Sequence, residues 1–159
     1  RAALAAKPVD ARITVSGYEG SELLVARLLI ESGARVPYVG TACPRTQWSD
    51  VDRQWLERRG GRGQYRASLE MDLAAVGEFK PDLAIGTTPV VQKAKQLAIP
   101  SLYFTNLISA RPLFGVAGAG SLAQVVNAAL ANQSRFDEKA RTPVSRQAAF
   151  EERAVRRPL

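Results

Sequence analysis

Three turns rich in glycine and hydroxyl residues hold the side chains of this sequence that could do chemistry. They span residues 17–21, 86–89 and 105–120. Each follows a short apolar run, and two lead directly into a helical pattern. Such turns present unpaired backbone N–H groups and small polar side chains to a ligand. For any one turn alone, a purely structural need for small and capping residues is the simpler interpretation.

The residues that we expect to form a binding or interface site come from these turns and the strand ends beside them. Asn106 and Arg111 lie in a stretch that also holds large apolar side chains. This mixture suits a flat, largely apolar ligand with a few anionic groups, and it suits a subunit interface equally well. No residue is assigned as catalytic, and nothing excludes Glu19 and Asp50 as proton donors. The candidate site residues are Gly17, Tyr18, Glu19, Thr87, Thr88, Tyr103, Asn106 and Arg111.

The residue types that are missing narrow the chemistry further. The chain has no histidine and one cysteine, Cys43. This excludes Ser-His-Asp and Cys-His catalysis, histidine-ligated metals, an intrachain disulfide and a metal site built of cysteines. We interpret Cys43 as a small, half-buried apolar residue rather than a ligand or redox group, and we expect no metal site in this chain.

Two glycine motifs that bind nucleotides are relevant to the turns. Residues 118–123 read Gly-Ala-Gly-Ser-Leu-Ala and match the dinucleotide fingerprint GxGxxA. A dinucleotide site needs this motif directly after a strand and an acidic residue at the end of a later strand. Here residues 106–117 separate the motif from the preceding strand, and no acidic residue ends a later strand. The phosphate-binding patterns GxxxxGKS and GxxxxGKT do not occur. We therefore expect no dinucleotide site and no ATP bound by this device.

The net charge of +7 raises the question of a nucleic-acid partner. One arginine cluster spans residues 53–66, and a second lies in the tail, where acidic residues are interleaved with it. No nucleic-acid-binding motif accompanies either cluster. We interpret both as solvated surface and expect no nucleic-acid partner, with a basic interaction module as a competing hypothesis.

Alternating strand and helix patterns predict the fold that positions these turns. The pattern predicts α/β architecture, a Rossmann-like open parallel sheet with helices on both faces. Ligands of such sheets bind at the carboxyl ends of the strands, where the three turns lie. Pro37 indicates a strand start or an edge position, and Thr88 is the expected N-cap of a helix with Pro89 in its first turn. Strands are expected at 11–16, 35–40, 60–65 (weak), 82–86 and 101–105, and helices start near Ser21, Ser49, Ser68, Thr88 and Ser121.

Length and composition fit one domain with residues to spare. Of 159 residues, 46% are apolar and 23% charged, as in ordinary globular proteins. No signal peptide and no apolar run long enough to span a membrane is present. We expect a soluble, cytoplasmic piece of a longer protein, with a linker at 1–10, a Rossmann-like domain at 11–135 and a basic, poorly ordered tail at 136–159.

Two blocks carry a resemblance to a known family. They are VSGYEGSELLVARLLIESGARVPYVGTACPRTQWSD at 15–50 and DLAIGTTPVVQKAKQLAIPSLYFTNLISARPLFGVAGAGSLAQVVNAAL at 82–130. Over about residues 11–136 the chain resembles the catalytic components of nitrogenase-like reductases, the family of the light-independent protochlorophyllide reductases. The second block resembles the Y-type, chlorophyllide-reducing subunits in particular. The tail and residues 60–63 depart from the family pattern.

The resemblance implies an assembly and a reaction. Such a Y-type subunit stacks several Rossmann-like domains and forms a heterotetramer with a Z-type subunit. The heterotetramer holds a four-iron, four-sulfur cluster, whose ligands would lie outside this chain, and binds a chlorophyllide pigment. A separate iron protein hydrolyses ATP and delivers electrons, so this chain itself would bind no ATP. The implied reaction reduces a chlorin ring double bond during bacteriochlorophyll synthesis. The alternative is a stand-alone Rossmann-like domain that binds a small ligand without catalysis.

Overall fold

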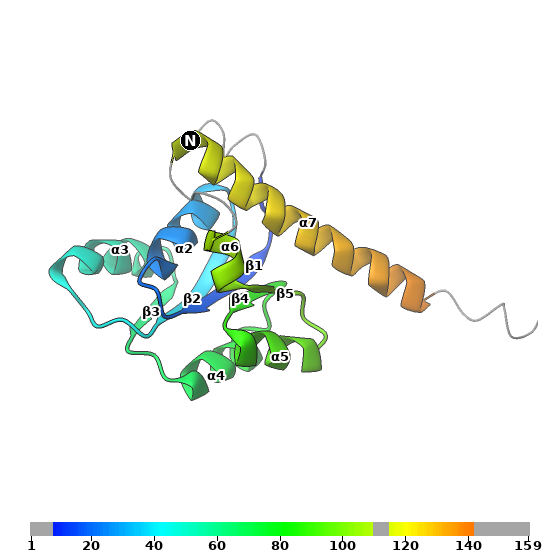
Figure 1. The fold of residues 1–159 in the computed structure, drawn as a ribbon, viewed down its shortest axis with the longest axis horizontal. Coiled ribbons are helices and arrows are strands. Elements are labelled where there is room, and N and C mark those ends of the chain that lie inside the picture. Colours follow the sequence, from blue (N-terminus) through cyan, green and yellow to red (C-terminus); the bar gives the residue numbers. More distant parts are fainter. Residues whose placement is uncertain (1–7, 110–114, 142–159) are drawn as a thin grey trace, which may run out of the picture.

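A five-stranded parallel sheet in the order β3-β2-β1-β4-β5 forms the centre of the molecule (Figure 1). The computed structural model describes residues 8–109 and 115–141. The Rossmann-like open parallel sheet predicted from the sequence is confirmed. The strands are β1 (Arg12–Gly17), β2 (Arg35–Thr41), β3 (Arg62–Tyr65), β4 (Leu83–Gly86) and β5 (Ser101–Tyr103). The helices are α2 (Glu22–Glu31), α3 (Gln47–Glu57), α4 (Leu69–Phe79), α5 (Thr88–Gln96), α6 (Phe104–Ser109) and α7 (Gly115–Arg141).

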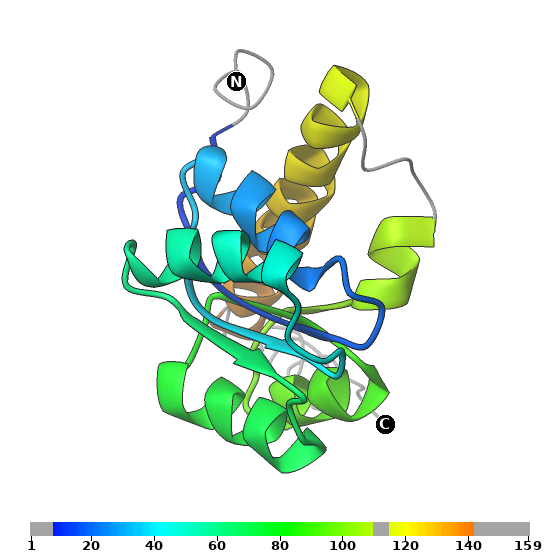
Figure 2. The same ribbon diagram turned by 90° about the vertical axis from the view of Figure 1, so that its left-hand side faces the viewer.

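Helices cover both faces of the sheet, as expected (Figures 1 and 2). α2, α3, α6 and α7 lie on one face, and α4 and α5 on the other. Side chains alternate between the two faces of the sheet along β1. Ile13 and Val15 therefore belong to the larger hydrophobic core of the molecule, whereas Thr14 and Ser16 point to the opposite face. β4 is buried along its whole length, because it lies inside the sheet and is covered on both faces.

Pro37 lies near the start of β2, and a strand start was one of the two positions that we expected for it. β2 is an interior strand, so the edge alternative is wrong. The register against β1 shifts here: Arg12 pairs with Arg35, but Thr14 pairs with Tyr38. One extra residue in β2 makes a bulge, and pairing with β3 begins only at Tyr38. Proline is tolerated at such a bulge because no ladder hydrogen bond is lost.

The helices α2 and α4 start after the predicted Ser21 and Ser68, whereas α3 and α5 start earlier than expected. α3 begins at Gln47 with Thr46 as its N-cap instead of near Ser49, because the Thr46 hydroxyl accepts the Ser49 N–H. Ser68 caps α4, since its hydroxyl accepts the Met71 N–H at 3.3 Å. The N-cap of α5 is Thr87 rather than Thr88, and its side chain makes no capping hydrogen bond. Both threonines offer a hydroxyl and the proline fits either the first or the second helical position, so the sequence did not distinguish them.

The stretch after β5 differs from the expected strand and long loop. β5 ends at Tyr103, and the residues that follow form α6 instead of continuing the strand to residue 105. Phe104 and Leu107 are both buried, three residues apart on one helix face. That burial outweighs the β-propensity of the aromatic run.

The small residues before Ser121 are helical rather than part of a loop. α7 begins at Gly115, and the buried Leu122, Ala123 and Val126 hold the helix against the larger core. This packing overrides the low helix propensity of the glycines. Residues 110–114 lie outside the described part of the chain.

Ordered structure continues past both ends of the range 11–135, which stays the expected extent of the domain. Val9 is fully buried in the larger hydrophobic core, and its backbone N–H donates to the Ser32 carbonyl oxygen at 2.8 Å. α7 continues through residues 136–141, which we assigned to the tail. The rest of that tail, 142–159, lies outside the described residues. Within residues 8–109 and 115–141, no helix combines the length and apolarity that crossing a bilayer requires.

Candidate functional site at the carboxyl edge of the sheet

The turn after β1 is built around a buried carboxylate. Glu22, in the first turn of α2, has no exposed surface. Its Oε1 accepts the backbone N–H of Glu19 at 2.7 Å, and its Oε2 has no hydrogen-bond partner in the structure. The carboxylate therefore holds the turn that precedes α2, whereas Ser21, the N-cap of α2, makes no side-chain cap bond.

Only glycine fits at position 17 beside this carboxylate. A Cβ there would overlap Glu22 Oε1, and it would lie 2.9 Å from Glu22 Cγ and 3.0 Å from the Phe104 ring. The chain thus passes between the start of α2 and the start of α6. The structure gives Gly17 a steric role, because the missing side chain lets the backbone of the β1 turn lie against α6.

Tyr18 and Glu19 meet Thr105 across the sheet edge. The Tyr18 and Thr105 hydroxyls lie 3.4 Å apart, and the Thr105 hydroxyl donates to Glu19 Oε1, also at 3.4 Å. Both distances are long for hydrogen bonds, so the contacts are weak. All three residues are exposed. We call Tyr18, Glu19 and Thr105 the edge cluster.

The turn after β2 packs on the turn after β1. The Cys43 thiol lies 3.7 Å from the Tyr18 carbonyl oxygen, and Ala42 N–H donates to the Gly17 oxygen at 3.0 Å. Cys43 is partly buried, in agreement with its interpretation as a small, half-buried residue. The carboxyl edge is thus continuous from β2 across β1 to α6.

Four of the other candidate residues lie on the same edge of the sheet. Thr87 and Thr88 stand at the start of α5 after β4, and Tyr103 ends β5. Asn106 is exposed on α6 next to Thr105. Arg111 lies outside the described residues. The functional roles of all eight candidates stay predictions.

A second buried carboxylate lies on the opposite face of the sheet, behind the edge. Asp72 Oδ1 accepts the hydroxyl of the buried Tyr38 at 2.8 Å. Burial is the main cause that raises the pKa of Asp72; the Tyr38 hydrogen bond opposes it, and the charge of Glu22 adds to it. Burial also raises the pKa of Tyr38, so its hydroxyl stays protonated and donates. A Cβ at Gly40 would overlap Asp72 Oδ1, so this pair needs the glycine beside it.

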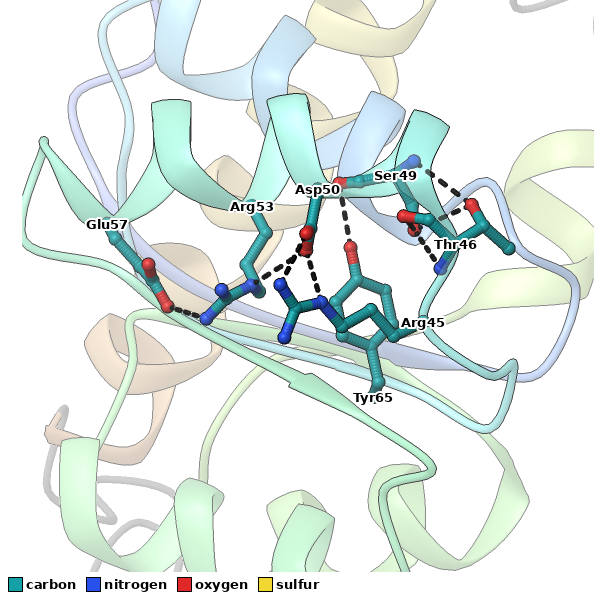
Figure 3. A network of polar contacts seen from close by, with 7 residues as sticks. All are labelled: Arg45, Thr46, Ser49, Asp50, Arg53, Glu57 and Tyr65. Carbon is teal, nitrogen blue, oxygen red and sulfur yellow. Dashed lines mark hydrogen bonds and ion pairs between the residues drawn. The ribbon is translucent and has the colours of Figure 1, made fainter.

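Asp50 is a poor proton donor. Arg45 Nε donates to Asp50 Oδ1 at 2.7 Å, and Arg53 Nε approaches the same oxygen at 3.4 Å (Figure 3). The hydrogen bond from Arg45 is the main cause that lowers the pKa of Asp50, and Arg53 adds to it. Of the two carboxylates that the sequence offered, Glu19 is the one that belongs to the edge cluster.

Comparison with known proteins identifies the family of this domain. The model of the nitrogenase component 1 type oxidoreductases matches residues 2–131. The chain belongs to this family.

Two relatives of this nitrogenase component 1 type chain are named chlorophyllide reductase 52.5 kDa chain. The chain is 72% identical over 138 residues to that of Cereibacter sphaeroides and 73% identical over 136 residues to that of Rhodobacter capsulatus. These matches cover 87% and 86% of the chain but only 28% and 27% of the relatives. The chain therefore spans little more than a quarter of their length.

A solved structure shows the same fold. The structure titled "Nitrogenase Cp1 at pH 6.5" matches with a TM-score of 0.66 and 18% sequence identity, over 83% of this chain and 31% of that one. At this identity the likeness concerns the fold alone. The open parallel sheet is thus that of a domain of nitrogenase component 1.

The residues of this chain do not fit an iron–sulfur cluster of their own. Such clusters are held mainly by several cysteine thiolates. The whole sequence has one cysteine and no histidine, and among the described residues no three potential metal ligands lie together. Cluster ligands would have to come from other parts of the complete protein.

Sequence reasoning missed two residues of this edge. Thr105 lay at the start of the third turn but was not named as a candidate residue, although it links Tyr18 and Glu19. Glu22 was not among the candidate residues. The sequence feature that could have indicated its inward orientation is Gly17, five residues earlier, because a glycine leaves room for a neighbouring side chain.

Proposed function

We propose that this chain is part of the catalytic component of a chlorophyllide a reductase, as one Rossmann-like domain of its Y-type subunit. The complete enzyme would reduce a ring double bond of the chlorin in an ATP-dependent reaction of bacteriochlorophyll biosynthesis. The observation that carries the proposal is the identity of 72% and 73%, over nearly the whole chain, to two proteins named chlorophyllide reductase chains. Membership of the nitrogenase component 1 family supports the reaction class.

The carboxyl edge is the part of this domain that we propose to face pigment or a neighbouring subunit. Tyr18 and Tyr103 expose aromatic surface there, and Thr105 and Asn106 add polar groups. Apolar walls with a few polar groups suit a flat macrocycle that carries carboxylate and carbonyl substituents. Glu22 and Gly17 would hold the shape of the wall, because they fix the turn that carries Tyr18 and Glu19.

The remaining parts of the machine would come from other polypeptide segments. A Z-type subunit would complete a heterotetramer, and a separate iron protein would hydrolyse ATP and deliver electrons. A four-iron, four-sulfur cluster would supply electrons to the pigment, with ligands outside this chain. We place the assembly in the cytoplasm as part of the same proposal.

Genetic complementation tests this function. The segment that corresponds to this chain is replaced, within the Rhodobacter capsulatus 52.5 kDa chain, by the sequence of this chain up to residue 135. The chimeric gene is placed in a strain that lacks the native one. We expect restored bacteriochlorophyll, and restoration should persist with the control change Leu97→Gln, since Leu97 is exposed at the far end of α5. A stably expressed chimera that leaves chlorophyllide unreduced would refute the proposal.

A further inference from the structure

A pocket of about 290 Å³ opens at the amino edge of the sheet, on the side opposite the edge cluster. The strands are parallel, so the starts of β1 and β2 lie at this edge, together with the end of α2 and the turn after α3. Its volume is at the lower end of the range of about 300–1,000 Å³ that is typical of small-molecule sites. We call it the amino-edge pocket. Its lining residues are Arg12, Ile30, Ala34, Arg35, Val36, Pro37, Arg59 and Gly60.

The amino-edge pocket is lined by positive charge. Three of its lining residues are arginines and none is acidic. Arg12 and Arg35 are register partners on the neighbouring strands β1 and β2, and like charges at such positions destabilise a sheet. The one carboxylate near Arg35 is that of Asp10 at 3.9 Å, but the Asp10 side chain is 98% exposed, so the ion pair is weak. An anion bound between the two arginines would offset their repulsion.

The guanidinium groups of Arg12 and Arg59 are held in place by neutral partners. Arg59 Nη1 donates to the Trp55 carbonyl oxygen at 3.1 Å, and the guanidinium carbon lies 3.8 Å from the centre of the Trp55 ring. Arg12 Nη1 donates to the Phe79 carbonyl oxygen at 3.3 Å. Within residues 8–109 and 115–141, neither arginine makes an ion pair with a carboxylate. A guanidinium has more N–H donors than these contacts use, so both groups can still bind a ligand.

The acidic groups at the ends of the neighbouring helices are already paired with other arginines. The pairs are Glu31 with Arg27 on α2, Glu57 with Arg53 on α3, and Glu78 on α4 with Arg62 on β3. The last carbonyl groups of α2 are occupied as well, because the N–H groups of residues 32–34 donate to them at 2.9–3.1 Å. These groups therefore leave the positive charge of the pocket without a counter-charge.

Two glycines bring the turn after α3 to the pocket. Gly60 has a φ of +80°, which glycine adopts more readily than other residues. A Cβ at Gly61 would lie 2.5 Å from Leu56 Cδ1 and 2.7 Å from the Val36 carbonyl oxygen, so only glycine lets this turn lie against β2. The turn belongs to residues 60–63, where the sequence departs from the family pattern. The resemblance to the family therefore implies no role for it.

We propose that the amino-edge pocket binds an organic phosphate, a phosphate monoester with a short apolar group. A phosphate monoester carries close to two negative charges and several acceptor oxygens, and the planar guanidinium of arginine binds two such oxygens at once. The carboxylate of a free acid or of an acidic side chain offers fewer oxygens and less charge, so it would use the three arginines less fully. Ile30, Val36 and Pro37 would contact the apolar group.

Isothermal titration calorimetry of the full-length chimeric 52.5 kDa chain tests the site, with hexyl phosphate as the probe. The titration is done at low salt, because salt screens exposed charges. We expect saturable binding of hexyl phosphate. Inorganic phosphate lacks the apolar group and hexanoate lacks the phosphate, so each should bind about tenfold more weakly or worse. The titration needs neither pigment nor electron transfer, so its result is independent of the proposed function.

Substitutions place the binding in the pocket. Arg35→Gln and Arg59→Gln should each weaken binding of hexyl phosphate about tenfold or more. Arg59→Lys keeps the charge but loses the planar geometry, so it should also weaken binding. Arg58→Gln is the matched control, because it removes the same charge from an exposed neighbour that does not line the pocket, and it should leave binding unchanged. Arg35, Arg58 and Arg59 are exposed, so the variants should keep the unfolding midpoint of the parent chain.

Three results would overturn the inference. If hexyl phosphate does not bind, the pocket takes no organic phosphate in the full-length chain or is covered by another segment of it. If Arg58→Gln weakens binding as much as Arg35→Gln and Arg59→Gln do, the overall positive charge attracts the anion and the pocket has no part in it. If hexanoate binds as tightly as hexyl phosphate, the site does not select phosphate.

Discussion

Glu22 accepts a hydrogen bond from the backbone N–H of Glu19 at 2.7 Å, although Glu22 itself is fully buried. The shape of the exposed β1 turn therefore depends on a side chain that no ligand can touch. Burial of a carboxylate with one unpartnered oxygen costs free energy, and the hydrogen bond to the turn offsets part of that cost.

The first prediction concerns this carboxylate. Glu22→Gln keeps an acceptor for the Glu19 N–H, so we expect the free energy of unfolding to change by no more than about 1 kcal/mol. Glu22→Ala removes the acceptor and leaves a cavity, so we expect a loss of about 2–4 kcal/mol. Denaturant unfolding of the purified protein measures both. Equal losses for the two variants would show that the turn does not depend on this hydrogen bond.

The second prediction uses two glycines with opposite surroundings. Gly17→Ala places a methyl group against the Glu22 carboxylate and the Phe104 ring, so we expect a loss of about 1–3 kcal/mol. Gly77 lies inside α4 with open space around it, so Gly77→Ala should stabilise the protein by about 0.5–1 kcal/mol. Thermal unfolding of both variants checks the contrast. A Gly17→Ala protein as stable as the wild type would contradict the steric requirement for glycine at position 17.

The third prediction concerns pH. Burial raises the pKa of Asp72 in the folded protein above its unfolded value of about 3.9. The folded state then holds the proton more tightly, so this contribution to stability is complete below pH 3.9 or so and is lost as the pH rises through the folded pKa. Compared with Asp72→Asn, the wild-type protein should become progressively less stable from acidic to neutral pH.

Urea unfolding at several pH values measures this trend, and Tyr38→Phe adds a check on its cause. The Tyr38 hydrogen bond opposes the rise in the pKa of Asp72, so its removal should raise that pKa further. The loss of stability should then extend to higher pH. A stability difference between wild type and Asp72→Asn that stays constant with pH would contradict the assignment.

The fourth prediction compares two N-cap threonines. Thr46 Oγ1 accepts the Ser49 N–H at 3.1 Å, whereas Thr87 makes no side-chain cap bond (Figure 3). Thr46→Ala should therefore cost about 1 kcal/mol and Thr87→Ala only a few tenths, because only the first loses a hydrogen bond. The unfolding free energies of the two variants test this difference. A larger loss of stability for Thr87→Ala than for Thr46→Ala would contradict the prediction.

The sequence predicted the alternation of elements well, because each helix and strand carries a local signal. Gly33, Ser68 and Pro89 mark helix ends through backbone conformation or hydrogen bonding of a few neighbouring residues. The continuous apolar run of β4 is likewise typical of a strand covered on both faces, and the structure buries all of it. Such local patterns can be interpreted from the sequence without knowledge of the tertiary contacts.

The errors fall where tertiary packing overrides local preference. Phe104 and Thr105 favour a strand by residue type, but burial of Phe104 with Leu107 makes them helical. The residues before Ser121 are poor helix formers, but the packing of Leu122 and Ala123 on the core holds α7 together. Glu22 was missed for the same reason, since only the three-dimensional approach of α2 to Gly17 shows that its carboxylate turns inward.

Reconstitution of chlorophyllide reduction with purified components tests the central claim most directly. A full-length chimeric 52.5 kDa chain that carries this domain is combined with the Z-type subunit, the iron protein, ATP and a reductant, and the bacteriochlorin product is followed by absorbance. We predict turnover that depends on every component and falls when Tyr18→Ala and Thr105→Val disturb the edge cluster, with Leu97→Gln as the unaffected control. A chimera that assembles with its partners and yields no bacteriochlorin would contradict the account.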